Sequence, residues 1–109
     1  MGNGRLDKEE VLRRLGGQMP RLRREYAVKK LALYGSFANG RPRPDSDVDI
    51  IVDLRRPLGL EFVEMAQRLE KELGRRVDIT TFASLRRSRN HRRFKRAARA
   101  IERSLVNVE

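Results

Sequence analysis

The sequence predicts a single small α/β domain, with a small mixed β-sheet backed by helices. Short apolar runs with strand character alternate with longer stretches whose apolar residues recur at helical spacing, and Gly- or Pro-containing turns separate them. The chain has 109 residues, which is enough for one hydrophobic core but leaves little room for a second domain. We therefore expect residues 1–109 to form one domain.

Two stretches of the sequence predict helices, one before the first strand and one between the second and third strands. The apolar positions from Glu9 to Val28 keep helical spacing, but Gly16-Gly17 and Pro20 interrupt them, so we expect two short helices or one kinked helix. From Gly59 to Leu73 the apolar stripe is uninterrupted, and Gly74 follows it as a helix stop. Both stripes belong to the core.

Three short segments predict strands. The apolar run from Leu31 to Tyr34 indicates a buried strand, and a second strand begins at Asp47 after a loop rich in Gly and Pro. The segment Val77-Asp78-Ile79 follows the Gly74 stop as a third strand. Helices that alternate with these strands complete the α/β pattern.

A turn and two carboxylates carry the chemistry of the sequence. Gly35 permits unusual backbone angles, and Ser36 offers a hydroxyl at the start of a helical turn whose free N–H groups attract phosphate. In the second strand Asp47 and Asp49 point to the same face, because side chains alternate along a strand. Facing carboxylates repel unless a cation lies between them, and oxygen ligands suit Mg²⁺ or Mn²⁺. Asp78 is the candidate for a third carboxylate.

The alternative is that these carboxylates only decorate a polar strand face. An Asp-x-Asp pair alone is common on edge strands, but a Gly-Ser turn before it and a third Asp in a later strand favour a catalytic site together. Asp45 lies next to Pro44 and suits a turn cap, while Asp53 has the parity of Asp49 but lies near the far end of the strand. We leave both out of the catalytic set.

These motifs resemble a known signature. Gly35-Ser36, followed after ten residues by Asp47-x-Asp49, is similar to the signature of the DNA polymerase beta-like nucleotidyltransferase superfamily, and the chain resembles its minimal nucleotidyltransferase branch. The resemblance runs from about Asp7 to the C-terminus and implies the polymerase beta-like fold. It also implies two Mg²⁺ ions held by Asp47, Asp49 and Asp78, with ATP as substrate. The branch often has a basic residue before the loop glycine, where this chain has Asn39. Arg41 or Arg43 is therefore the candidate source of the triphosphate contact, and we take Arg41 as the nucleotide-binding residue.

The resemblance further implies what receives the nucleotide. Larger relatives carry a helical domain for the acceptor, and minimal ones are commonly encoded beside a helical HEPN ribonuclease toxin. The expected activity is transfer of AMP from ATP to a tyrosine of that toxin, which makes this chain an antitoxin. Two alternatives stay open: an antitoxin that acts by binding alone, and a nucleotidyltransferase that acts on RNA or a small molecule.

Charge and composition set further expectations. The net charge is +11, and the segment from Ser84 to Glu109 contributes +7 of it, with nine Lys or Arg and two Glu. Apolar residues at helical spacing in this segment predict a basic helical arm at about 84–105, either a solvated face or a surface for nucleic acid or an acidic partner. The chain has no cysteine, no apolar run of membrane-spanning length and no signal-peptide pattern, so we expect a cytoplasmic protein without disulfides. A homo-oligomer is left open.

Overall fold

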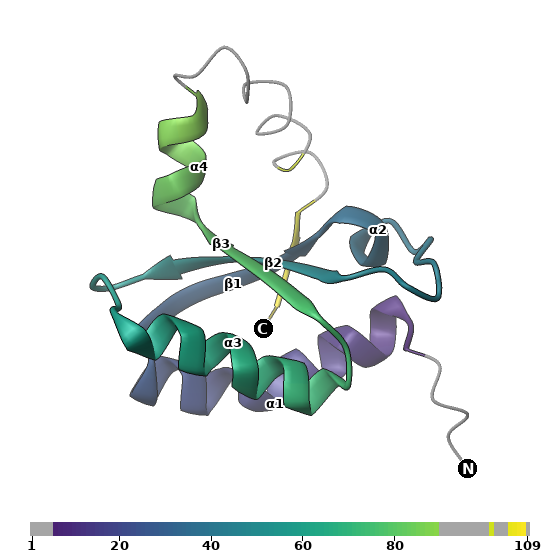
Figure 1. Cartoon of the computed structure of the whole chain (residues 1–109), viewed down its shortest axis with the longest axis horizontal. Helices are drawn as coiled ribbons and strands as arrows, with labels where there is room; N and C mark the ends of the chain where they lie inside the picture. Colours follow the sequence, from purple (N-terminus) through teal and green to yellow (C-terminus); the bar gives the residue numbers. More distant parts are fainter. Residues whose placement is uncertain (1–5, 90–100, 102–104, 109) are drawn as a thin grey trace.

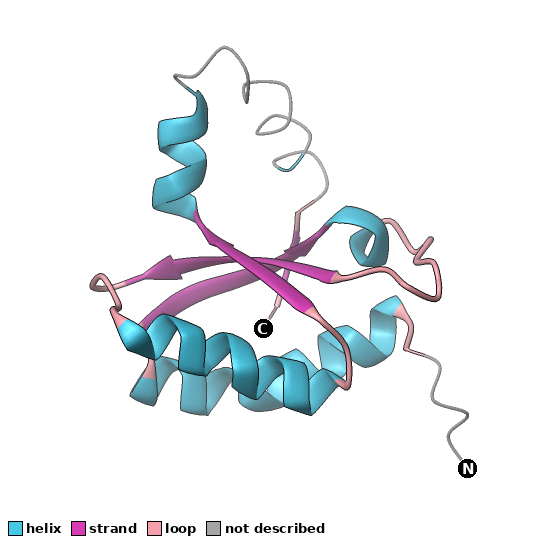
Figure 2. Cartoon of the chain, in the orientation of Figure 1, coloured by secondary structure: helices cyan, strands magenta, loops and turns pink. Residues whose placement is uncertain are grey.

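The structure, a computed structural model, describes residues 6–89, 101 and 105–108. Helices and strands alternate along most of this part of the chain (Figure 2). In chain order the elements are α1 (Lys8–Glu25), β1 (Val28–Tyr34), α2 (Gly35–Ala38), β2 (Val48–Leu54), α3 (Leu60–Leu73), β3 (Val77–Thr81), α4 (Phe82–Arg89) and β4 (Val106–Asn107).

The strands form one mixed sheet in the order β3-β2-β1-β4. β1 runs antiparallel to both β2 and β4, whereas β3 runs parallel to β2. The prediction of a small mixed sheet backed by helices is confirmed. The sequence did not reveal β4, because its two residues are too few to show an alternation of apolar and polar positions.

α1 is one unbroken helix, so the alternative of two short helices is wrong. The Asp7 side chain caps it by accepting a hydrogen bond of 2.9 Å from the backbone N–H of Glu10. Pro20 lies inside the helix on its exposed side. The opposite side is buried along its whole length, and this packing holds the helix together across the proline. Its buried residues are Val11, Leu15, Met19 and Leu22.

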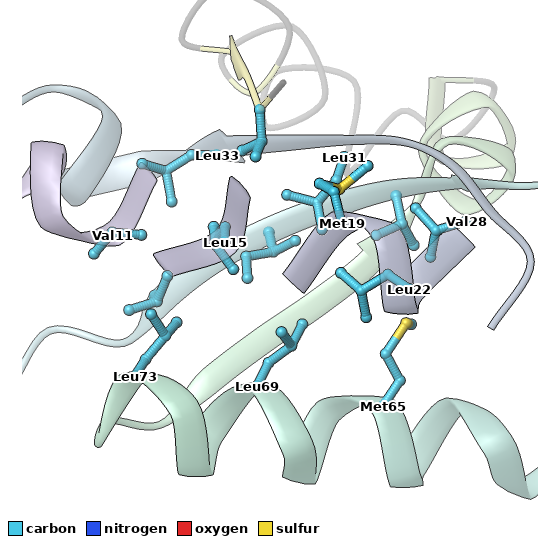
Figure 3. Close-up of a cluster of buried hydrophobic side chains, with 14 of the residues drawn as sticks. Val11, Leu15, Met19, Leu22, Val28, Leu31, Leu33, Met65, Leu69 and Leu73 are labelled. Carbon is cyan, nitrogen blue, oxygen red and sulfur yellow. The ribbon is translucent and has the colours of Figure 1, made fainter. Parts of the chain in front are cut away.

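α3 begins and ends close to where the sequence predicts. Gly74 adopts a left-handed conformation with φ of 66°, and its N–H donates to the carbonyl of Glu70 at 2.8 Å, which terminates the helix. α1 and α3 lie side by side on one face of the sheet (Figure 1). Their apolar residues meet those of β1 and β2 in one core (Figure 3).

The two faces of the sheet carry different cores. Alternate residues of β2, such as Val48, Ile50 and Val52, belong to the large core under α1 and α3. Ile51 points to the other face, where it packs with Ala32 and with Leu85 of α4. Asp49 shares the parity of Ile51, so it also lies on this second face. α4 stands on that side of the sheet (Figure 1).

Only part of the predicted basic arm can be compared with the structure. Its beginning is helical as α4, but at its end Leu105 is not helical and Val106 enters β4. The structure does not describe residues 90–100 and 102–104 of the arm. These include the arginines beyond α4, His91 and most of the predicted apolar stripe. In the described part of the chain, no helix is long and apolar enough to cross a membrane.

Candidate active site

The turn from β1 into α2 places backbone directly against a carboxylate. Gly35 has φ of 76°, a conformation that residues with a Cβ rarely adopt. A Cβ added at Gly35 would overlap Oδ2 of Asp49 and would lie 3.2 Å from its Cγ. Gly35 therefore meets two demands at once, because it allows the turn and leaves room for the Asp49 carboxylate.

Asp49 is the electrostatic centre of the site. It pairs with Asp78 in the parallel β2–β3 register, and Asp47 immediately precedes β2. Burial, and after it the charges of Asp78 and Asp47, together raise the pKa of Asp49 from its ordinary value of 3.8 to about 6. The fold thus brings two further carboxylates within electrostatic reach of Asp49.

Tyr34 also belongs to this site, although the sequence indicated only a strand residue. It pairs with Asp49 across the β1–β2 ladder and is half-buried on the second face. Burial, followed by the charges of Asp49 and Asp78, raises the pKa of the Tyr34 phenol to about 12. Strand parity could have found it, since alternate residues of β1 face opposite sides of the sheet.

Ser36 lies within the short α2 turn, and Arg41 follows α2. Ser36 is half-buried, and its carbonyl accepts a hydrogen bond of 3.0 Å from the N–H of Arg41. The Arg41 side chain is exposed. The structure therefore keeps Arg41 close in space to the Gly-Ser turn, where a long cationic side chain is able to reach a bound phosphate.

The loop in front of Asp47 contacts a residue that the sequence did not single out. Arg75 follows Gly74 in the α3–β3 turn, and its guanidinium donates hydrogen bonds to carbonyls of this loop. A hollow of about 480 Å³ lies between the loop and the turn, and both Asp47 and Arg75 line it. No local sequence pattern points to such a contact, because the partners are about 30 residues apart.

Asp45 and Asp53 lie outside the group of carboxylates around Asp49. Asp45 is exposed in the loop, and Asp53 lies near the far end of β2, beside a second pocket. Neither is among the charges that act on Asp49. Within residues 6–89, 101 and 105–108, no three Asp, Glu, His or Cys side chains are grouped tightly enough to hold one ion by themselves.

Fold and site together define a nucleotidyltransferase, and comparison with known families agrees. The Nucleotidyltransferase domain family matches residues 18–104, so the chain belongs to this family. The family resemblance and the enzyme class that the sequence predicted are thereby confirmed.

Individual relatives narrow the class. The chain is 38% identical over 82 residues to protein adenylyltransferase MntA of Thermococcus cleftensis, a match that covers 74% of this chain and 83% of MntA. A solved structure described as a candidate minimal nucleotidyltransferase superposes with a TM-score of 0.68 at 26% identity, over 96% of this chain and 98% of that one. A toxin–antitoxin crystal structure with AMP-PNP superposes with a TM-score of 0.52 at 28% identity, and the match covers 65% of this chain and 57% of the chain in that structure.

Proposed function

We propose that this chain is a protein adenylyltransferase that transfers AMP from ATP to a tyrosine hydroxyl of a HEPN toxin, and that it thereby acts as an antitoxin. The observation that carries the proposal is the carboxylate centre around Asp49, which faces the Gly35 turn. The similarity of this chain to MntA, which is named a protein adenylyltransferase, supports a protein as the acceptor of AMP. The toxin–antitoxin structure with AMP-PNP supports an adenine nucleotide as the donor.

The chemistry of the site fits Mg²⁺. Asp47, Asp49 and Asp78 offer only oxygen ligands. Burial raises the pKa of Asp49 first, and the negative charges of Asp78 and Asp47 raise it in the same direction, with no cationic side chain of the described residues opposing them. Mg²⁺ is commonly held by one or two carboxylates with substrate phosphates and water, so a preformed cage of three side chains is not required. Bound there, two Mg²⁺ ions, or Mn²⁺ in their place, supply charge neutralisation at the triphosphate.

The residues of the chain have separate roles in the proposed reaction. Gly35 and Ser36 hold the phosphates against the α2 turn, with Arg41 as an added positive charge. The tyrosine oxygen of the acceptor bonds to the α-phosphorus of ATP, and the bond from that phosphorus to pyrophosphate breaks. By analogy with the family, Asp78 accepts the tyrosine proton. Positioning and charge neutralisation supply most of the rate enhancement.

The decisive experiment compares carboxylates in β2 and directly before it. Labelled ATP, Mg²⁺ and the HEPN protein encoded beside this chain are incubated with the parent, with the double variant D47N/D49N and with D53N. We expect the double variant to lose transfer by roughly 100-fold or more, because charge neutralisation at the phosphates depends on these groups. D53N is the matched control, since Asp53 lies on the same strand and face but far from Gly35, and it should transfer AMP normally.

The same variants separate the enzyme from its alternatives. If D47N/D49N neutralises the toxin fully and label never reaches the toxin with the parent protein, the binding-only antitoxin is the correct account. If label reaches RNA or a small molecule but not the toxin, the acceptor is wrong while the enzyme class stands. Calorimetry with Mg-ATP adds a direct readout, and the double variant should not bind the nucleotide.

A further inference from the structure

The loop between α2 and β2 has little of its own to hold it on the domain. A small turn closes within it, where the N–H of Ser46 donates to the carbonyl of Arg43 at 3.0 Å and the N–H of Arg43 donates to Oγ of Ser46 at 2.7 Å. Arg43, Pro44 and Asp45 are exposed, so the turn buries no apolar anchor. Asp47 follows this turn directly, and its position depends on what fixes the turn.

One guanidinium fixes it. The two N–H groups of Arg75 Nη1 are shared among three carbonyls of the turn, those of Arg43 at 3.3 Å, Pro44 at 2.9 Å and Ser46 at 3.1 Å. The same guanidinium lies 5.4 Å from the centre of the Phe37 ring, and Phe37 is fully buried in α2. A half-buried cation that donates to carbonyls is a stronger tie than a neutral donor. Arg75 therefore links the loop to α2 and to the α3–β3 turn.

The base of this link is itself well ordered by hydrogen bonds. The N–H groups of Gly74 and Arg75 both donate to the carbonyl of Glu70, at 2.8 and 3.3 Å. Oε2 of Glu70 accepts from the N–H of Val77 at 3.0 Å, which fixes the start of β3 just before Asp78. The N–H of Val48 donates to the carbonyl of Arg76 at 2.9 Å, which joins β2 to the same turn. One turn thus sets the relative position of both carboxylate strands.

We propose that Arg75 is a positioning residue of the nucleotidyl-transfer site and that it acts through the loop that carries Asp47. The bonds from Nη1 go to backbone carbonyls and the guanidinium lies over the Phe37 ring, so these contacts of Arg75 hold the protein backbone. The competing role is a direct phosphate contact, since Arg75 also lines the hollow beside Asp47. The proposal relies on the proposed function only where the rate of AMP transfer is measured.

Three variants separate these roles. R75M keeps an unbranched side chain against Phe37 but removes all the donors, whereas R75K restores a cation with three donors. R14M is the matched control: Arg14 is also half-buried and also bonds a backbone carbonyl, that of Glu72 at 3.3 Å, but this carbonyl belongs to α3 and lies away from the loop. All are measured well below their unfolding temperatures, so that lost stability alone does not change the rate.

The expected result is a kinetic split. R75M should lower kcat by roughly 10- to 100-fold with the KM for ATP within about threefold of the parent. Asp49 and Asp78 keep their places in the paired strands and still bind Mg-ATP, whereas a misplaced Asp47 weakens stabilisation of the transition state. R75K should recover a substantial part of the loss, and R14M should have the parent kcat. A raised KM with unchanged kcat would overturn positioning in favour of a direct phosphate contact, and parental kinetics in R75M would overturn any role.

Hydrogen exchange provides a readout that needs no activity. In R75M the hydrogen-bonded amides of Arg43, Ser46 and Val48 should exchange roughly tenfold faster or more, while R14M should leave them unchanged. If the parent protein transfers no AMP to the toxin, the proposed function fails, but the exchange rates still decide whether Arg75 holds the loop. Parental exchange of this segment in R75M means that Arg75 does not hold the loop.

Discussion

Replacing Gly35 by alanine tests the site at its tightest contact. The substitution has two separable costs: the left-handed backbone at φ of 76° and the overlap of the new Cβ with the Asp49 carboxylate. The backbone term alone is roughly 1–2 kcal/mol of folding free energy. In a domain of this size, it lowers the unfolding temperature by about 4–16 °C.

The second cost affects catalysis. Because Oδ2 of Asp49 occupies the space that the Cβ needs, the carboxylate or the α2 turn must move. A displacement on the order of 1 Å at a catalytic group lowers the rate by roughly 100-fold. We therefore expect G35A to be folded at 25 °C, less stable than the parent, and slower in AMP transfer by about two orders of magnitude.

Two other glycines provide the control. Gly40 and Gly74 have φ of 73° and 66°, and a Cβ at either position meets no atom within 4 Å. G40A and G74A should therefore show the stability loss of the strained backbone but keep most of the activity. The assays are thermal unfolding by circular dichroism and initial rates of label transfer. If G35A transfers AMP within about threefold of G40A at a temperature where both are folded, the close approach of Gly35 to Asp49 has no catalytic role and our reasoning is refuted.

Three further predictions follow from the same structure. Because the folded-state pKa of Asp49 is raised from 3.8 to about 6, the metal-free protein should lose stability as pH rises from about 4 to about 6, and D49N should remove this loss in thermal melts across that range. Y26F removes a buried hydroxyl that donates to Glu64 at 2.8 Å, so it should cost about 0.5–1.5 kcal/mol in denaturant titrations and leave kcat unchanged. If the basic arm binds nucleic acid, the logarithm of the association constant should fall with the logarithm of the salt concentration, with a slope of roughly 0.7–0.9 per phosphate contact. The quadruple variant R92E/R93E/R96E/R99E should then abolish the binding. Equal affinity of parent and variant at low salt would mean that the arm is only a solvated face.

Local sequence determined the elements on which the site is built. The alternation along β2 assigns Asp49 to one face and Ile50 to the other, since side-chain direction in a strand depends only on parity. Gly74 marks the end of α3, because glycine adopts the left-handed conformation at low cost. The Gly35-Ser36 turn and the Asp-x-Asp pair can likewise be recognised without knowledge of distant residues, and these two motifs were enough to predict the family from the sequence.

Tertiary structure decided everything that depends on which strands and loops are neighbours. The parallel β2–β3 register pairs Asp49 with Asp78, and neither this pairing nor the raised pKa that it helps to cause is encoded in either strand alone. Tyr34 and Arg75 enter the site for the same reason, because their partners are distant in sequence. Strand pairing and hydrogen bonds across loops arise from contacts between separate segments, whereas periodicity records only which way each residue of one segment faces.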